Sequence, residues 1–323
     1  MNEPRRTWSV FTNPEDGRPR AGWRLLLHLF VLMLLLSFWQ LALQGWPGHG
    51  NLLYLVYGGF ITLSVWIAAQ LFDRRKFKEY GLKLSPQWYR DCLFGIVLGL
   101  VSMSILFFVY WSAGWAEFNG WGWERAHNRD YFWVIGGYFV MMIAVGFYEE
   151  LVFRGYQTKN LAEALMVGKI DNNKAAFIAV AVTSVFFGVM HYSNPNATVV
   201  STINISIAGI MLGLPYILTN SLALPIGLHF SWNFFQGGVF GFPVSGNPPR
   251  ESLIQIVIDG PQLITGGSFG PEGGVTGAIM IIILIIVVLY YYRQMPMPKA
   301  SPEFTAPPEL FDTPKISTKN KRV

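Results

Sequence analysis

Two acids lie in one apolar stretch of this sequence, and a base directly follows the stretch. Glu149 and Glu150 are adjacent within residues 131–153, and Arg154 follows Glu150 by four positions. On a helix, an acid four residues before a base can form an ion pair, so we expect Arg154 to keep Glu150 ionised. Glu149 points about 100° away around the helix. Because its charge is less compensated, Glu149 is the better candidate for proton transfer.

Two further apolar segments each contribute a histidine. Phe187-x3-His191 ends one segment, and His229-x3-Asn233 lies within another. A spacing of four places both side chains of a pair on one helical face. The acid pair, the two histidines and Asn233 together supply a base, candidate metal ligands and hydrogen-bond donors for an oxyanion. These are the groups needed to activate water and hydrolyse an amide.

Each motif also has a structural explanation. The Glu/Arg cluster could reach the headgroups from a helix end, His191 could bond a backbone carbonyl, and His229 with Asn233 could join helices. Ionisable groups inside a membrane segment nevertheless favour a functional site. The pattern Gly266-x-Ser268-x-Gly270 matches a nucleophile elbow, but it lies in a glycine-rich loop without the strand-turn-helix context that this motif requires.

Composition indicates the elements that must position these residues. The chain has 323 residues, of which 52% are hydrophobic and 13% charged; soluble domains have about 25% charged residues. The single cysteine, Cys92, excludes an internal disulfide framework. The net charge of +5 does not indicate nucleic-acid binding, because the basic residues cluster at the ends of apolar segments.

The sequence predicts an all-α, polytopic helix bundle with about eight transmembrane helices. Each span needs roughly 20 apolar residues. The expected spans are 23–43, 52–72, 92–113, 131–153, 175–192, 197–219, 221–241 and 274–292. Of the 24 Lys and Arg residues, 21 fall on the side that would contain both termini, so the positive-inside rule predicts cytoplasmic termini.

The expected organisation is one membrane domain with two short tails. The cytoplasmic N-terminal tail covers residues 1–22, the membrane domain 23–292 with its motif core at about 130–241, and the cytoplasmic C-terminal tail 293–323. The basic, aromatic segment 73–91 is either an interfacial element or an ordinary positive-inside loop. The Gly95-x3-Gly99 and Gly209-x3-Gly213 spacings favour close packing of helices within the chain.

The ordered motifs Glu-Glu-x3-Arg, Phe-x3-His and His-x3-Asn resemble those of the CAAX prenyl endopeptidase and bacteriocin-processing (CPBP or Abi) family of intramembrane proteases. The resemblance covers about residues 130–241, including Tyr148-Glu-Glu-Leu-Val-Phe-Arg-Gly-Tyr156. It implies that Glu149 activates water with help from His191, and that Glu150 and Arg154 are a supporting pair. His229 and Asn233 would stabilise the oxyanion.

The resemblance leaves the cofactor open between zinc and a metal-independent glutamate protease. If a metal is used, Glu149, His191 and His229 are the implied ligands. The His-Glu-x2-His zinc motif is absent from the sequence. The implied activity is hydrolysis of a membrane-associated, lipidated or C-terminal peptide in a bacterial inner (plasma) membrane. The expected partners are this substrate and the bilayer. The alternatives are a proton-coupled transporter and an inactive scaffold or immunity protein.

Helix counting raises one difficulty. If the fourth span ended near Arg154, Glu149 would lie at the cytoplasmic edge, whereas His191 would lie about 17 residues above Lys174, roughly 25 Å deeper. Residues 155–165 contain no proline and suit a helix. We therefore expect the fourth helix to continue towards Leu165, which would lift both acids into the membrane.

Overall fold

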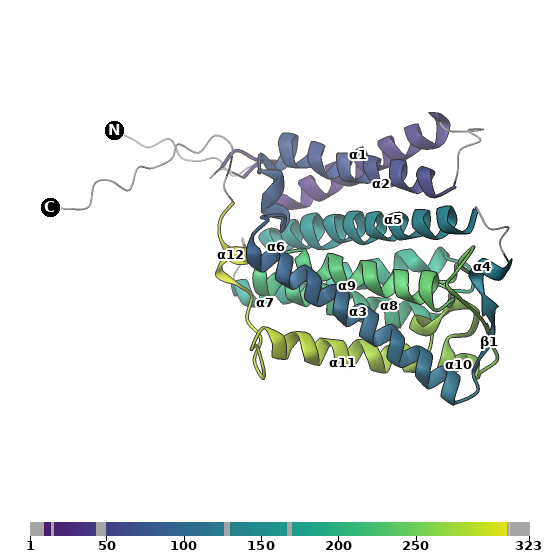
Figure 1. Cartoon of the computed structure of the whole chain (residues 1–323). Coiled ribbons are helices and arrows are strands. Elements are labelled where there is room, and N and C mark those ends of the chain that lie inside the picture. The colour runs from purple at the N-terminus through teal and green to yellow at the C-terminus, as the bar shows by residue number, and fades with distance from the viewer. Residues whose placement is uncertain are drawn as a thin grey trace, which may run out of the picture.

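The computed structural model describes residues 10–13, 16–42, 50–125, 130–166, 170–308 and 310. Over this part of the chain the protein is a helix bundle with one small sheet at one end (Figure 1). The α-helices are α1 Ala21–Ala42, α2 Gly50–Ala68, α3 Pro86–Ser112, α4 Gly122–Arg125, α5 Asp130–Glu150, α6 Lys159–Met166, α7 Asn172–Met190, α8 Val199–Thr219, α9 Ala223–Asn233, α10 Gln262–Thr265, α11 Val275–Tyr291 and α12 Pro302–Thr305.

Shorter helical segments of other pitch and two strands complete the described structure. The π-helical segments are η1 Ala69–Asp73, η3 Leu151–Thr158 and η5 Phe234–Val239. The 3-10 segments are η2 Phe77–Tyr80, η4 His191–Ser193, η6 Gly267–Phe269 and η7 Pro271–Gly273. The strands β1 Ala116–Trp121 and β2 Ile254–Ile258 pair antiparallel, with Ala116 opposite Ile258.

The predicted membrane helix bundle is confirmed. Six helical runs in the described residues are long and apolar enough to cross a membrane. The other two predicted spans are also helical but shorter: α11 has 17 residues, and α9 has 11 before it continues into η5. The chain is thus a multi-pass membrane protein.

The fourth helix continues well past the acid pair, as expected. The segments α5, η3 and α6 form one helical run, Tyr131–Met166, of 36 residues. Directly after Glu150 the run changes from α-helical to π-helical hydrogen bonding. A second π-helical segment begins directly after Asn233. Such π segments often occur at functional sites, and both follow predicted site residues here.

Helix α9 lies inside the bundle and is covered by its neighbours. It packs against α3, α5 and α8, and α8 packs against α7; Figure 1 shows α9 between α5 and the pair α8 and α11. Two glycines allow close approach. A Cβ at Gly99 would lie 2.6 Å from the backbone nitrogen of Trp232, and one at Gly209 would lie 2.9 Å from the Cα of Ser184. The expected packing within the chain is confirmed at these positions.

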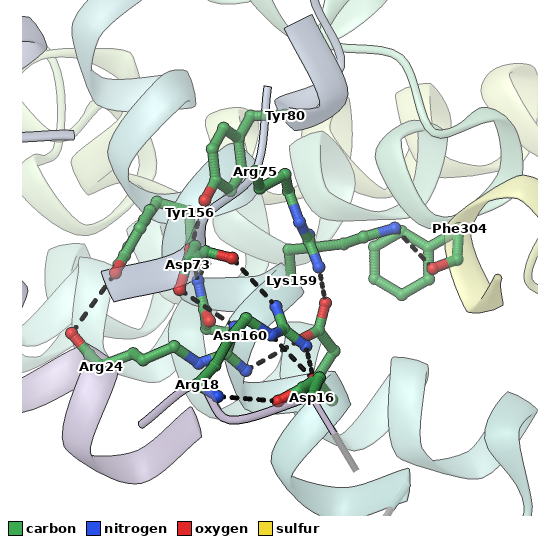
Figure 2. A network of polar contacts seen from close by, with 11 residues as sticks. Asp16, Arg18, Arg24, Asp73, Arg75, Tyr80, Tyr156, Lys159, Asn160 and Phe304 are labelled. Atoms are coloured by element: carbon green, nitrogen blue, oxygen red, sulfur yellow. Dashed lines mark hydrogen bonds and ion pairs between the residues drawn. The ribbon is translucent and has the colours of Figure 1, made fainter. Parts of the chain in front are cut away.

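A cluster of buried charges closes the end of the bundle where α6 and α12 lie (Figure 2). Glu163 accepts from Arg24 at 2.8 Å and also pairs with Arg75 and, at 3.6 Å, with Arg18. Asp73 accepts from Arg24 at 3.0 Å. Opposite charges therefore compensate one another where water is excluded.

This cluster includes the beginning of segment 73–91. Arg75 and Tyr80 are buried, and the Tyr80 hydroxyl donates to Asp73. Burial, followed by the charge of Asp73, raises the pKa of Tyr80 well above its usual value. The beginning of this segment is therefore packed into the protein, and its position at the cytoplasmic interface stays a prediction. Charge alone did not reveal this, because Glu163, the acid partner of Arg75, lies on α6.

Both predicted tails are anchored where they are described. Arg18 donates to the carbonyl of Asp73 at 3.3 Å. In the C-terminal segment, the Lys159 ammonium donates to the carbonyl of Phe304 at 2.6 Å and lies 4.5 Å from the centre of its ring. Residues 1–9, 14–15, 309 and 311–323 of the two predicted tails lie outside the described residues.

Candidate active site

The acid pair lies in the middle of the bundle, and Glu150 is its fully buried member. Oε1 of Glu150 accepts from the Arg154 guanidinium at 2.9 Å, one helical turn away. Arg154 also donates to the carbonyl of Gly209 at 3.3 Å, and its guanidinium carbon lies 4.3 Å from the centre of the Phe187 ring. The structure therefore contains the expected ion pair, and α7 and α8 fix its basic partner.

His229 joins this pair from α9. Its Nδ1 lies 2.7 Å from Oε1 of Glu150, so that one carboxylate oxygen receives both the histidine and Arg154. Because Oε1 is a carboxylate acceptor, Nδ1 is the donor of this bond. The other ring nitrogen, Nε2, is then free to face a different group. The hydrogen bond to Glu150 thus sets the tautomer of His229.

The group that Nε2 faces is Glu149. Its Oε2 lies 3.8 Å from Nε2 of His229, beyond a direct hydrogen bond. Oε2 is buried and has no hydrogen-bond partner within the described part of the chain. The Glu149 side chain as a whole remains 20% exposed, whereas that of Glu150 is fully enclosed. The two acids therefore differ as expected, with Glu150 compensated and Glu149 available.

His191 and Asn233 lie beside a small cavity that His229 also lines. The cavity has a volume of about 50 Å³, which is enough for a few water molecules. The Nδ1 atom of His191 lies 2.8 Å from the carbonyl of Phe187, and the centre of the Phe187 ring lies 4.6 Å from that of His191 and 6.3 Å from that of His229. The structure thus gathers Glu149, Glu150, Arg154 and His229 in direct proximity, with His191 and Asn233 one layer away around the cavity.

The depth difficulty disappears in the three-dimensional arrangement. Glu149 lies near the middle of the run Tyr131–Met166, and His191 directly follows the last residue of α7. The two helices are consecutive in the chain and antiparallel. Glu149 and His191 lie at nearly the same number of residues from the segment that connects these helices. Both residues therefore lie at a similar level in the bundle.

One acidic residue of the cavity was not predicted from the sequence. Glu272 in η7 is 3% exposed and lines the cavity together with Ser245 and Trp232. Its segment reads as a loop rich in glycine and proline, and no helical spacing relates Glu272 to the three motifs. The available signal was an acid directly before the apolar segment 274–292.

The arrangement does not fit the three-ligand metal site that the family resemblance implied. Among the described residues, no group of three or more His, Cys, Asp or Glu side chains is close enough to hold a metal ion. We therefore derive no catalytic step through zinc.

Comparison with known proteins bears on the same region. A family model described as type II CAAX prenyl endopeptidase Rce1-like matches residues 131–235. The matched region runs from α5 into η5 and contains all three motifs, which confirms the resemblance inferred from them. No curated protein and no solved structure gave a match.

Proposed function

We propose, from the premise that the motif region of this chain belongs to the type II CAAX prenyl endopeptidase Rce1-like family, that the protein is an intramembrane endopeptidase using a glutamate-activated water. The observation that carries this proposal is that the imidazole of His229 faces both acids. Its Nδ1 lies 2.7 Å from Oε1 of Glu150, and its Nε2 lies 3.8 Å from Oε2 of Glu149. The substrate class is a membrane-associated peptide with a lipidated or C-terminal cleavage site.

In the proposed reaction Glu149 takes a proton from a water molecule as the water oxygen attacks the carbonyl carbon of the scissile amide. His229 faces Glu149 through Nε2 and stabilises the proton that Glu149 gains. Arg154 and Glu150 hold the imidazole in place. An available carboxylate beside an oriented histidine is suited to general base catalysis.

The attack produces a tetrahedral intermediate with a negative oxygen. The side-chain amide of Asn233, in the wall of the cavity, is the proposed donor to this oxygen. Collapse of the intermediate breaks the carbon–nitrogen bond, and Glu149 returns its proton to the leaving amine. His191, which lines the same cavity, is proposed to orient the attacking water.

The decisive experiment uses purified protein in liposomes and a fluorescence-quenched peptide that ends in a prenylated Cys-a-a-X sequence. We expect the wild type to cut this peptide and Glu149→Gln to lose roughly 10²- to 10⁴-fold in rate, the usual contribution of a general base. The matched control is Glu117→Gln, an exposed acid on β1, which should retain the wild-type rate. Treatment with a metal chelator should leave the rate unchanged.

A proton-coupled transporter is the second candidate, because the same three titratable side chains could relay a proton. The same liposomes distinguish the two functions. Glu149-dependent proton flux without peptide cleavage would support a transporter. A wild-type cleavage rate in Glu149→Gln would remove Glu149 from the reaction. If neither cleavage nor flux occurs, a scaffold role remains.

A further inference from the structure

Glu272 is a buried carboxylate at the cavity that the proposed reaction does not use. Its Oε1 accepts from the backbone nitrogen of Ser245 at 2.7 Å and from its hydroxyl at 2.6 Å. Its Oε2 accepts from the indole nitrogen of Trp232 at 3.4 Å. No basic side chain of the described residues lies within ion-pair distance of it, so neutral donors hold this carboxylate.

The backbone around Glu272 is also held by side-chain hydrogen bonds. The Asn204 side chain, from α8, donates to the carbonyls of Glu272 and Gly274, both at 3.0 Å. Ser245 has a φ of 47°, a left-handed conformation that is uncommon for a residue other than glycine. Glu272 binds both the N–H and the O–H of Ser245, which stabilises this conformation.

The two carboxylate oxygens of Glu272 bind residues from different parts of the cavity wall, Ser245 and Trp232. Ser245 belongs to the turn between η5 and β2, and its carbonyl accepts from Asn194, just beyond the His191 motif, at 3.0 Å. Trp232 lies on α9, directly before Asn233 and three residues after His229. One side chain therefore connects the segments that carry the second and third motifs.

We propose that Glu272 is a positioning residue for peptide hydrolysis, and this inference rests on the proposed function. By binding Trp232 and the turn at Ser245, its carboxylate sets the orientation of the adjacent Asn233 and the shape of the cavity. If Asn233 is displaced, its hydrogen bond to the tetrahedral oxyanion weakens more than the binding of the substrate does. A loss of positioning therefore lowers kcat more than it raises KM.

The test is a double-mutant cycle between Glu272→Gln and Trp232→Phe in the liposome assay. Glutamine retains an acceptor for Ser245 but places an amide N–H₂ against the indole N–H, whereas phenylalanine keeps an aromatic ring but removes the indole donor and part of the ring volume. Each single variant is expected to lower kcat about tenfold with KM within about twofold. Because both remove the same contact, the double variant should resemble either single one.

Several outcomes would overturn the proposal. Unchanged kcat in Glu272→Gln together with a lower unfolding temperature would indicate a structural role alone. Independent effects, with a loss of about a hundredfold in the double variant, would show that the two residues do not act through one contact. Glu303→Gln, an exposed acid in α12, is the matched control and should retain wild-type kcat.

Failure of this proposal is distinguishable from failure of the proposed function. If the wild type cuts no peptide, the proposed function fails. The Glu272–Trp232 contact is then judged by unfolding temperatures of the same four proteins. A non-additive shift supports the contact, and an additive shift overturns it. Should Glu272→Gln not fold, kcat of Ser245→Ala is measured outside the cycle, because this variant removes only the hydroxyl donor to Oε1 and leaves the contact with Trp232. A wild-type kcat in Ser245→Ala and in Trp232→Phe would then overturn the proposal.

Discussion

Nδ1 of His229 lies 2.7 Å from Oε1 of Glu150, although the two residues are 79 positions apart in the chain. Arg154 reaches the same oxygen at 2.9 Å from its own helix. A buried carboxylate that receives two charged or polar donors fixes both of them in orientation. This single oxygen therefore joins the first and third motifs and leaves Nε2 of His229 facing Glu149.

Replacement of Glu150 by alanine should destabilise the protein by about 3–5 kcal/mol, because it leaves the Arg154 guanidinium buried without its charge partner. The double variant Glu150→Leu with Arg154→Met should be destabilised much less than Glu150→Ala, since an apolar pair of similar volume can replace a buried ion pair. Denaturant or thermal unfolding in detergent measures both. A loss below about 1 kcal/mol in Glu150→Ala would contradict this role.

The two histidines should differ in their effect on cleavage. His229→Ala removes a group that faces both acids, so we expect kcat/KM to fall by roughly 10²- to 10⁴-fold. His191→Ala should cost less, because in this structure its Nδ1 bonds only the carbonyl of Phe187 in its own helix. Initial rates with the quenched prenylated peptide give the order. A larger loss for His191→Ala would reverse the assignment of the two residues.

The charge cluster at Glu163 should affect stability without affecting the chemistry. Three arginines, Arg18, Arg24 and Arg75, pair with this one carboxylate. Arg18 and Arg24 each have a second acid partner, whereas Glu163→Ala leaves the buried Arg75 without its carboxylate and should cost about 3–5 kcal/mol. The cleavage rate per folded molecule should remain that of the wild type. Unfolding midpoints test the expected loss of stability, and measurements of the active fraction test the unchanged cleavage rate. A lower kcat in the folded fraction would show that the cluster affects the chemistry as well.

Features carried by local spacing could be predicted. The ion pair of Glu150 and Arg154 follows from four-residue spacing on one helix, and the continuation of the helix beyond Arg154 follows from a stretch without proline. The membrane bundle follows from apolar segments of sufficient length. Each of these depends on residues that are close in the chain.

Features that depend on distant contacts could not be predicted in the same way. Arg75 reads as a loop charge and is buried because its carboxylate partner lies on α6. Glu272 reads as a loop acid and becomes part of the cavity because Asn204 and Trp232, on two other helices, hold it there. No periodicity connects these pairs, so their positions depend on how the helices pack.

The sequence by itself determined the membrane class, the helical architecture and the set of polar residues placed in apolar helices, because the energetic cost of burying polar groups in hydrocarbon restricts where they occur. Only the tertiary structure decided which carboxylate binds His229, which one remains available, and that Glu272 joins the cavity. These outcomes depend on helix rotation and crossing, and differences of a few ångströms there decide whether two side chains form a hydrogen bond.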